Sequence, residues 1–148
     1  MKFGNGIGSR NYDTKIQGCL LYTSSSEDLR FLKEVCADFA LPATLFPDYS
    51  ETLDGPSMEI YKKIPEGGTS LAALRAMPAA RASIELGRTL RQKRTAASFL
   101  QERFSVPAKR IGLPIGINES DIFFAAMEKL SGHKTPEKYC LLYTSRCV

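Results

Sequence analysis

Residues 24–50 read SSSEDLRFLKEVCADFALPATLFPDYS, which is a helix-like stretch followed directly by a short apolar run. Ser24 and Glu27 have the spacing of a capping box, in which side chain and backbone satisfy each other's free groups at a helix start. Apolar residues then recur at helical spacing, at Leu29, Leu32, Cys36 and Phe39. Pro42 ends this helix, and residues 43–46 are typical of a buried strand. A helix followed by such a strand predicts one unit of a parallel α/β sheet.

The rest of the chain continues this alternation. Thr69 or Ser70 caps a helix over residues 71–77, and Pro78 fits the first turn of another helix. The last predicted elements are a helix from about Thr95 to before Pro107, a strand-like run over 110–117, and a helix capped within 118–121 and closed by Gly132. This order predicts an α/β layered fold with a short parallel sheet. Two strands are few for a self-sufficient sheet, so we expect the sheet to be incomplete.

Composition limits the class of protein. The 148 residues fit one domain, and 43% hydrophobic with 24% charged residues is the balance of a globular chain. We expect no membrane-spanning helix, because uninterrupted apolar stretches are only a few residues long. Residues 1–10 lack the apolar core of a secretory signal. The net charge of +4 does not identify a partner, and a single His argues against histidine-rich metal sites.

The four cysteines do not form a recognisable metal motif. No Cys-x-x-Cys is present, and free thiols in a reducing cytosol are the default expectation. The hexapeptide CLLYTS occurs at residues 19–24 and again at 140–145, which we interpret as an assembly or adapter artefact. The predicted organisation is therefore an irregular, partly suspect segment 1–24, a domain over 25–139 and a suspect non-native tail 140–148. Cys36, on a helical apolar stripe, is interpreted as a small buried hydrophobe.

Two turn-rich segments are candidates for a binding site. Asp48 and Asp54 flank a loop after the strand 43–46, at the strand end where α/β sheets usually bind ligands. The alternatives are a plain surface connection and capping or turn roles for both carboxylates. Residues 67–69, Gly-Gly-Thr, precede a helix and offer backbone amides to an anion, although a tight turn with a cap explains them as well. They lack the Lys and the spacing of a P-loop, so we do not expect nucleotide binding.

Basic residues concentrate between Arg75 and Arg110. Nine Lys or Arg side chains face only Glu85 and Glu102 in this interval, which gives a local balance of +7. Such a cluster, densest at residues 91–94, could bind phosphates. No aromatic residues interleave with it as stacking platforms, so a solvated face or a contact with an acidic partner is the preferred interpretation. A small nucleic-acid-binding module centred on residues 88–94 is kept as an alternative.

An ordered series of motifs resembles the nitrogenase component 1 family. The motifs are SEDLR at 26–30, LFPDYSETLDGP at 45–56, IPEGGT at 64–69, LPIGI at 113–117 leading to Ser120-Asp121, and Ser131-Gly132 followed by PEKY at 136–139. The beta chain of the molybdenum–iron protein is the nearest pattern, with its paralogous cofactor-assembly scaffold as close kin. The likeness covers about residues 25–139 and fails where the repeated hexapeptide begins. Family chains are several times longer, so the sequence resembles an internal fragment.

The resemblance implies a Rossmann-like, three-layer helix/parallel-sheet/helix fold in a cytoplasmic complex. It also implies an alpha-type partner subunit, an ATP-driven iron protein as electron donor, an iron–sulfur P-cluster and an iron–molybdenum cofactor in the parent enzyme, which reduces dinitrogen. The family's alpha chain has a cofactor-ligating Cys that would fall near residues 87–91, where this sequence has none. The beta-chain cluster ligands lie in an N-terminal part that has no counterpart here.

No catalytic, cofactor-binding or metal-binding residue is therefore assigned to this chain. A cluster needs several converging thiolates, which residues 25–139 do not supply. His133 follows a helix-ending glycine, and we expect it to be exposed rather than part of a proton relay. The function expected is a structural piece of a beta-type nitrogenase subunit, with a cofactor-biosynthesis scaffold as the alternative. A core cut from a larger sheet exposes edges and apolar patches, so the isolated chain is expected to aggregate or fold only partly.

Overall fold

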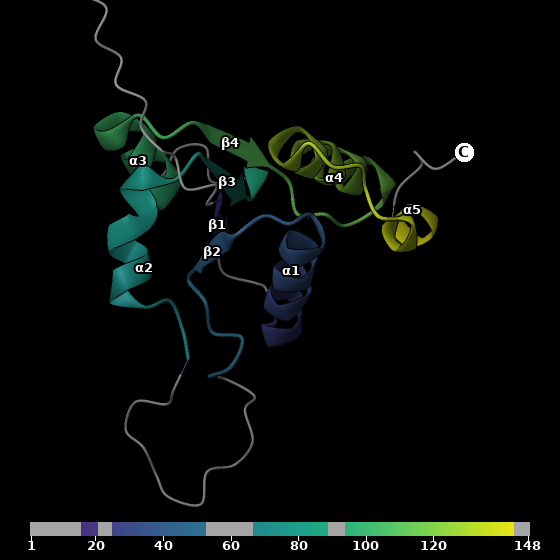
Figure 1. The fold of residues 1–148 in the computed structure, drawn as a ribbon, viewed down its shortest axis with the longest axis horizontal. Coiled ribbons are helices and arrows are strands. Elements are labelled where there is room, and N and C mark those ends of the chain that lie inside the picture. Colours follow the sequence, from purple (N-terminus) through teal and green to yellow (C-terminus); the bar gives the residue numbers. More distant parts are fainter. Residues whose placement is uncertain (1–15, 21–24, 53–66, 89–93, 144–148) are drawn as a thin grey trace, which may run out of the picture.

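Strands and helices alternate along the chain in the computed structural model, which describes residues 16–20, 25–52, 67–88 and 94–143. The elements are β1 (Ile16–Leu20), α1 (Ser26–Asp38), β2 (Ala43–Phe46), α2 (Leu71–Ala76), the 3₁₀ helix η1 (Met77–Ala79), β3 (Ala82–Leu86), α3 (Ala96–Phe104), β4 (Ala108–Ile111), α4 (Ile117–Ser131) and α5 (Glu137–Tyr143). The strands of this part of the chain form one parallel sheet in the order β2-β1-β3-β4 (Figure 1). This confirms the predicted α/β class.

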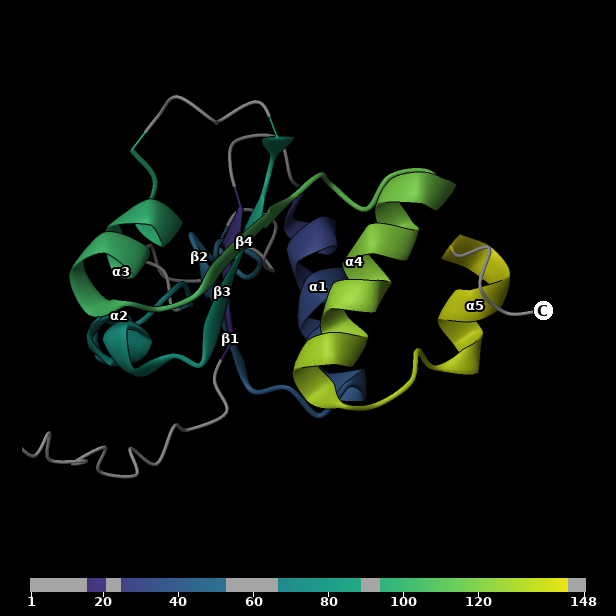
Figure 2. The same ribbon diagram turned by 90° about the horizontal axis from the view of Figure 1, so that it is seen from above.

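Helices cover both faces of the sheet. Figure 2 shows α1 and α4 on one face, with α5 beyond them, and α2 and α3 on the other. The larger core lies under α1 and α4, where buried side chains include Leu29, Val35, Phe39, Ile84, Phe124 and Met127. A smaller core under α2 and α3 is built on Met77, Ala80, Leu100 and Val106. The predicted three-layer, Rossmann-like arrangement is therefore confirmed: helical connections between parallel strands place helices on both faces of the sheet.

The first helix and the strand after it follow the sequence pattern closely. The capping box uses Ser25 and Asp28 rather than Ser24 and Glu27: the Ser25 amide donates to Asp28 Oδ2 at 2.7 Å, and the Asp28 amide donates to Ser25 Oγ at 3.2 Å. The helix ends before Ala40, which adopts a left-handed φ of 51°. The strand β2 occupies residues 43–46 as predicted.

Two strands were missed. The interpretation of residues 1–24 as irregular is wrong at Ile16–Leu20, which form β1 between β2 and β3. The helix expected to begin at Pro78 is also wrong, because Pro78 lies in η1 and β3 follows at once. All five residues of β3 are buried, and one of them is Glu85. Strand prediction depends on an apolar pattern, and the charged Glu85 interrupts that pattern within the five residues of β3.

The helix and strand types predicted for the C-terminal half are found in the structure, but their first and last residues differ from the predicted ones. The helix predicted from about Thr95 is α3, and Thr95 caps it by accepting the Ser98 amide at 3.2 Å. The strand predicted over 110–117 is β4 at Ala108–Ile111 instead, because two glycines and a proline at 112–116 interrupt it. The helix α4 begins at Ile117 and ends at Gly132, whose φ of 77° suits a glycine. The helix α5 was not predicted.

Candidate functional site

The loop after β2 is held by its own carboxylate. Asp48 Oδ1 accepts hydrogen bonds from the Ser50 amide at 3.1 Å and the Ser50 hydroxyl at 2.8 Å. Asp48 Oδ2 forms an ion pair with Lys33 Nζ of α1 at 2.9 Å. Burial opposes ionisation of Asp48, but the hydrogen bonds from Lys33 and Ser50 outweigh it and lower the pKa of this carboxyl. These bonds support the turn-forming interpretation of Asp48, whereas Asp54 lies outside the described residues.

The Gly-Gly-Thr turn closes onto the same loop. The Thr69 hydroxyl donates to the Leu45 carbonyl at 2.6 Å and accepts the Asp48 amide at 3.2 Å. Gly67 and Gly68 adopt φ values of 117° and 88°, which residues with a Cβ rarely tolerate. The interpretation of residues 67–69 as a turn therefore has a structural basis: the threonine joins the turn to the carboxyl end of β2. Ser70 then caps α2 through the Ala73 amide at 3.1 Å.

Two arginines of the basic interval 75–110 form ion pairs, one of them with a carboxylate outside that interval. Arg88 forms an ion pair with Glu119 of α4 at 2.8 Å, and Arg94 lies 3.8 Å from Glu102. Glu119 is distant in sequence, so a charge balance taken over residues 75–110 could not include it. Residues 89–93, the densest part of the cluster, lie outside the described residues.

A buried ion pair between β3 and β4 is the main feature that sequence reasoning missed. Glu85 is only 1% exposed and accepts two bonds from Arg110, from Nε at 2.8 Å and from Nη2 at 3.2 Å. The Thr95 hydroxyl at the start of α3 donates to the same carboxylate at 2.7 Å. One acidic side chain thereby links two strands and a helix. The signal available in the sequence was a lone Glu inside an apolar run.

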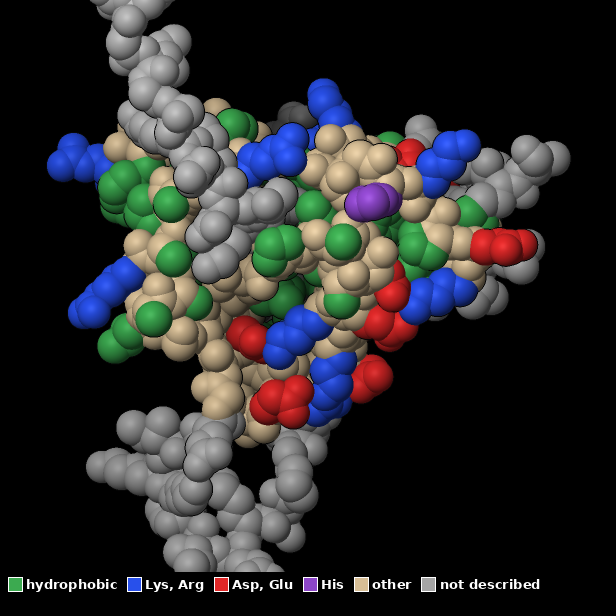
Figure 3. Space-filling model, viewed as in Figure 1, with side chains coloured by type: hydrophobic (Ala, Val, Ile, Leu, Met, Phe, Trp, Pro, Cys, Tyr) green, Lys and Arg blue, Asp and Glu red, His purple; other side chains and the backbone are tan. Residues whose placement is uncertain are grey.

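The described thiols do not form a metal centre. Cys36 is a half-buried free thiol that packs against the larger core, and burial raises its pKa to about 11. The expectation of four free thiols is wrong for Cys140, which is disulfide-bonded; such pairing depends on proximity in space, which sequence spacing does not give. His133 is exposed, as expected (Figure 3). No group of three or more His, Cys, Asp or Glu side chains that could hold a metal occurs within the described ranges.

These residues do not fit an iron–sulfur cluster. Cluster irons are held by several thiolates, and the free thiol among the described residues is one whose burial disfavours the thiolate. None of the helices in the described part combines the length and apolar character that a membrane span requires.

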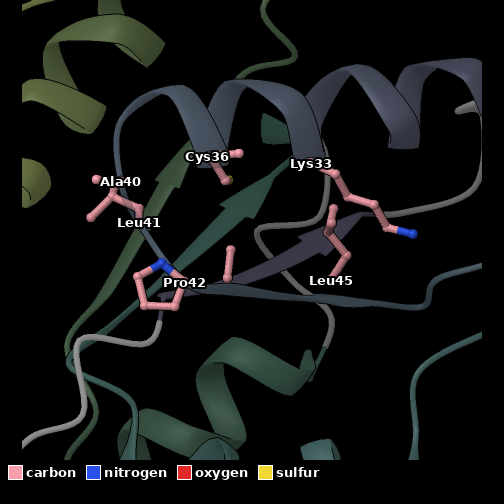
Figure 4. Close-up of a pocket in the computed structure, with 8 residues that line it drawn as sticks. Lys33, Cys36, Ala40, Leu41, Pro42 and Leu45 are labelled. Carbon is pink, nitrogen blue, oxygen red and sulfur yellow. The ribbon is translucent and has the colours of Figure 1, made fainter.

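Two hollows flank the exposed edge of β2. One, of about 370 Å³, lies between α1 and β2 and is lined by Cys36, Ala40 and Pro42 among others (Figure 4). The other, of about 270 Å³, lies toward α2 and is lined by Thr44, Thr69 and Ser70 among others. In Figure 4, Lys33 and Cys36 extend from α1 above Pro42 and Leu45. The first hollow has a mostly apolar lining, and the second has hydroxyl groups in its wall.

Comparison with known proteins places this arrangement in a family. Residues 16–141 match nitrogenase component 1 type oxidoreductases. The chain is 33% identical over 113 residues to the nitrogenase iron-molybdenum cofactor biosynthesis protein NifN of Nostoc sp., covering 76% of this chain and 25% of that protein. It is 32% identical over 109 residues to the nitrogenase molybdenum-iron protein beta chain of Clostridium pasteurianum, covering 74% of this chain and 23% of that one.

A solved structure shares the fold. Nitrogenase Cp1 at pH 6.5 superposes with a TM-score of 0.77 at 29% sequence identity, over 85% of this chain and 27% of that chain. The chain thus spans about a quarter of the length of these relatives. The matched residues include every motif on which the resemblance was based, and they extend back over β1. The chain belongs to the nitrogenase component 1 type oxidoreductase family.

Proposed function

We propose that this chain is a structural part of a component 1 subunit, of the beta type or of the related cofactor-biosynthesis type. Its role is to supply one α/β layer against which the remaining polypeptide packs. Support comes from the family match over residues 16–141. In this proposal no catalytic, cofactor-binding or metal-binding residue is assigned to the chain, and we expect the chain by itself to catalyse no reaction.

The parent protein that we infer works in nitrogen fixation. Its complex contains an alpha-type subunit, receives electrons from an ATP-driven iron protein, and carries an iron–sulfur P-cluster and an iron–molybdenum cofactor held by residues other than those described here. We place it in the cytoplasm. The domain proper corresponds to about residues 25–139 with β1 added, because β1 lies between two other strands of the sheet.

A chimera tests this role. Residues 16–141 replace the matched segment of the Clostridium pasteurianum beta chain, which is then produced with its alpha-type partner. We expect a complex of native size with its normal metal content, because the transplanted segment supplies fold and no ligands. A chimera that folds but does not join the complex would refute the proposed role.

The cofactor-biosynthesis role is the second candidate, since the Nostoc NifN protein is similar to the same degree. The same segment transplanted into that NifN protein separates the two possibilities. If the chain derives from a biosynthesis protein, the NifN chimera retains its partner and the beta-chain chimera does so less well. The nucleic-acid alternative, centred on residues 88–94, is favoured by no specific observation: Arg88 and Arg94 have carboxylate partners, and residues 89–93 lie outside the described ranges.

A further inference from the structure

The outer surface of the layer formed by α2 and α3 exposes large apolar side chains. Leu71 on α2 is 72% exposed, and Phe99 and Phe104 on α3 are 44% and 42% exposed. The two rings lie edge to face, with their centroids 5.9 Å apart. Leu100 of α3 lies in the smaller core and Leu74 of α2 packs against it, so the two helices are neighbours on one side of the sheet (Figure 2). We call the surface made by Leu71, Arg75, Phe99, Arg103 and Phe104 the α2–α3 face.

Two arginines accompany the apolar side chains of this face. Arg75 lies four residues after Leu71 on α2, and Arg103 lies four residues after Phe99 on α3. Residues at this spacing are neighbours on a helix surface, so each arginine lies beside an exposed apolar side chain. Both arginines are exposed, and neither forms an ion pair with a residue in the described ranges. The face therefore combines apolar contact area with uncompensated positive charge.

The carboxylates of this layer are already occupied. Residues 67–88 and 94–111 contain two of them, Glu85 and Glu102. Glu85 is buried against Arg110, and Glu102 lies opposite Arg94 at 3.8 Å. On the side of the molecule drawn in Figure 3, blue and green side chains gather over α2 and α3, whereas the red ones lie over α1, α4 and α5. A protein that complements the α2–α3 face must therefore bring its own carboxylates.

We propose that the α2–α3 face binds an acidic partner protein through an amphipathic helix of that partner. Apolar side chains of the helix pack on the rings of Phe99 and Phe104, and carboxylates on its flanks pair with Arg75 and Arg103. Aromatic residues and arginine are the side chains enriched at the centres of protein interfaces. The backbone groups of α2 and α3 are used within the helices, so side chains make the contact. This inference goes beyond the proposed function, because it does not depend on the type of subunit from which the chain comes.

The arrangement favours a protein over a polynucleotide. A polynucleotide is charged at every nucleotide, so a strand that crosses the face needs a row of free cations. Arg94, just before α3, already pairs with Glu102, which leaves two separated arginines on this face rather than a row. Base stacking also needs an open ring face, and the edge-to-face contact between Phe99 and Phe104 covers part of one. An apolar centre with a cation on each helix matches an amphipathic acidic helix instead.

Peptide binding to the 148-residue chain tests the inference. The chain is immobilised at low density on a biosensor, so that copies of it do not meet. The probe is a synthetic peptide of about four helical turns, with leucines along one face and glutamates on both flanks. One reference peptide carries lysine at every glutamate position, and the other carries glutamate at every leucine position. We expect the probe to bind with an affinity that falls as salt is raised, and both reference peptides to bind at least about tenfold more weakly.

Substitutions assign the binding to the face. Phe99→Ala removes one ring, and Ile117→Ala is its matched control, because Ile117 is an exposed apolar residue of α4. Arg103→Glu reverses one charge, and Lys129→Glu makes the same reversal at an exposed position in the last turn of α4. We expect Phe99→Ala and Arg103→Glu each to weaken binding at least about tenfold, and the two controls to change it less than about twofold. Arg103 is a surface residue, so its substitution stays informative if the loss of a ring disturbs α3.

The inference is overturned if the probe does not bind, if either reference peptide binds as tightly, or if the control variants lose as much affinity. Tighter binding of single-stranded oligothymidine than of the probe would assign the face to nucleic acid and overturn it too. So would self-association of the free chain that Phe99→Ala abolishes, because a second copy would then occupy the face.

The beta-chain chimera separates this inference from the proposed function. Once the chimera has assembled with its alpha-type partner, we expect it to bind the probe as the 148-residue chain does. A probe that binds the chain and not the assembled chimera would mean that the parent complex covers the face, which overturns the inference alone. If the chimera does not assemble while the chain binds the probe as expected, only the proposed function fails.

Discussion

Replacing Arg110 with methionine isolates the contribution of the buried ion pair. The change removes both hydrogen bonds from the guanidinium, while Glu85, which is 1% exposed, keeps the hydrogen bond from the Thr95 hydroxyl. Breaking a buried pair from one side typically costs 3–5 kcal/mol. The lower value, about 3 kcal/mol, applies here because the Arg110 side chain is 31% exposed and water can reach its side of the pair.

Native-state hydrogen exchange in the beta-chain chimera measures this effect locally. A loss of about 3 kcal/mol corresponds to a roughly 100-fold faster exchange of the β3 amides. The double variant Glu85→Leu with Arg110→Met should restore most of the protection, because it removes both charges and keeps apolar volume. Arg94→Met is the matched control: its ion pair with Glu102 is 3.8 Å long and exposed on both sides, so its loss should change exchange by less than about threefold. A double variant as unprotected as the single one would refute the reasoning.

Three further outcomes follow from the described contacts. The pKa of Asp48 is lowered in the fold, so its stabilising contribution is complete above the ordinary value of 3.8 and disappears as pH falls through the folded value. The protection of the amides of residues 48–52, taken relative to their intrinsic exchange rate at each pH, should therefore decrease on acidification, and Asp48→Asn should remove that pH dependence. Burial raises the pKa of Cys36 to about 11, so its thiol should react with iodoacetamide at pH 8 far more slowly in the folded protein than in protein unfolded by urea. Mass spectrometry measures both rates, and equal rates would contradict the burial of Cys36. The isolated chain should aggregate or fold only partly, and a cooperative thermal transition of a monodisperse monomer would contradict this.

The local rules of helix capping and apolar spacing predicted some elements well. The strand β2 coincides with the run ATLF, and α3 begins directly after Thr95, near which its helix was expected to begin. These signals are contained within a few neighbouring residues, so no tertiary information is needed to use them. The start of α1 differed by one residue because three serines in succession offer competing caps, and Ser25 with Asp28 prevails over Ser24 with Glu27.

The missed elements depend on contacts between distant residues. The strand β3 holds Glu85, which can be buried only because Arg110 comes to it from the neighbouring strand. The strand β1 contains Gln17 and Gly18, which weaken its apolar pattern, and it is specified by pairing with β2 and β3 on its two sides. The helix α5 packs through Tyr139, whose hydroxyl donates to Asp38, while Lys138 reaches Glu34 at 2.7 Å; both partners lie on α1 about a hundred residues away.

The functional interpretation depends on the resemblance of several short motifs to one family, because no single residue of the chain indicates a function. The sequence presents the turn at 67–69 and the loop at Asp48 as two separate candidate sites. In the structure Thr69 joins them, because its hydroxyl donates to the Leu45 carbonyl and accepts the Asp48 amide. Neither feature by itself distinguishes a ligand site from a tight connection. Their joint use of one threonine explains why both motifs occur together in one chain, since each turn stabilises the other.

The position of β1 in the sheet also affects how the chain is made. A ribosome releases β1 before both of its neighbours, and the second of them, β3, begins only at Ala82. During synthesis one side of β1 therefore stays unpaired until β3, at Ala82–Leu86, has also emerged. Such late closure between distant segments is slow and leaves time for chaperone capture or faulty pairing. Slower translation between β2 and β3 should therefore lengthen the time for which this side of β1 is open to a wrong partner.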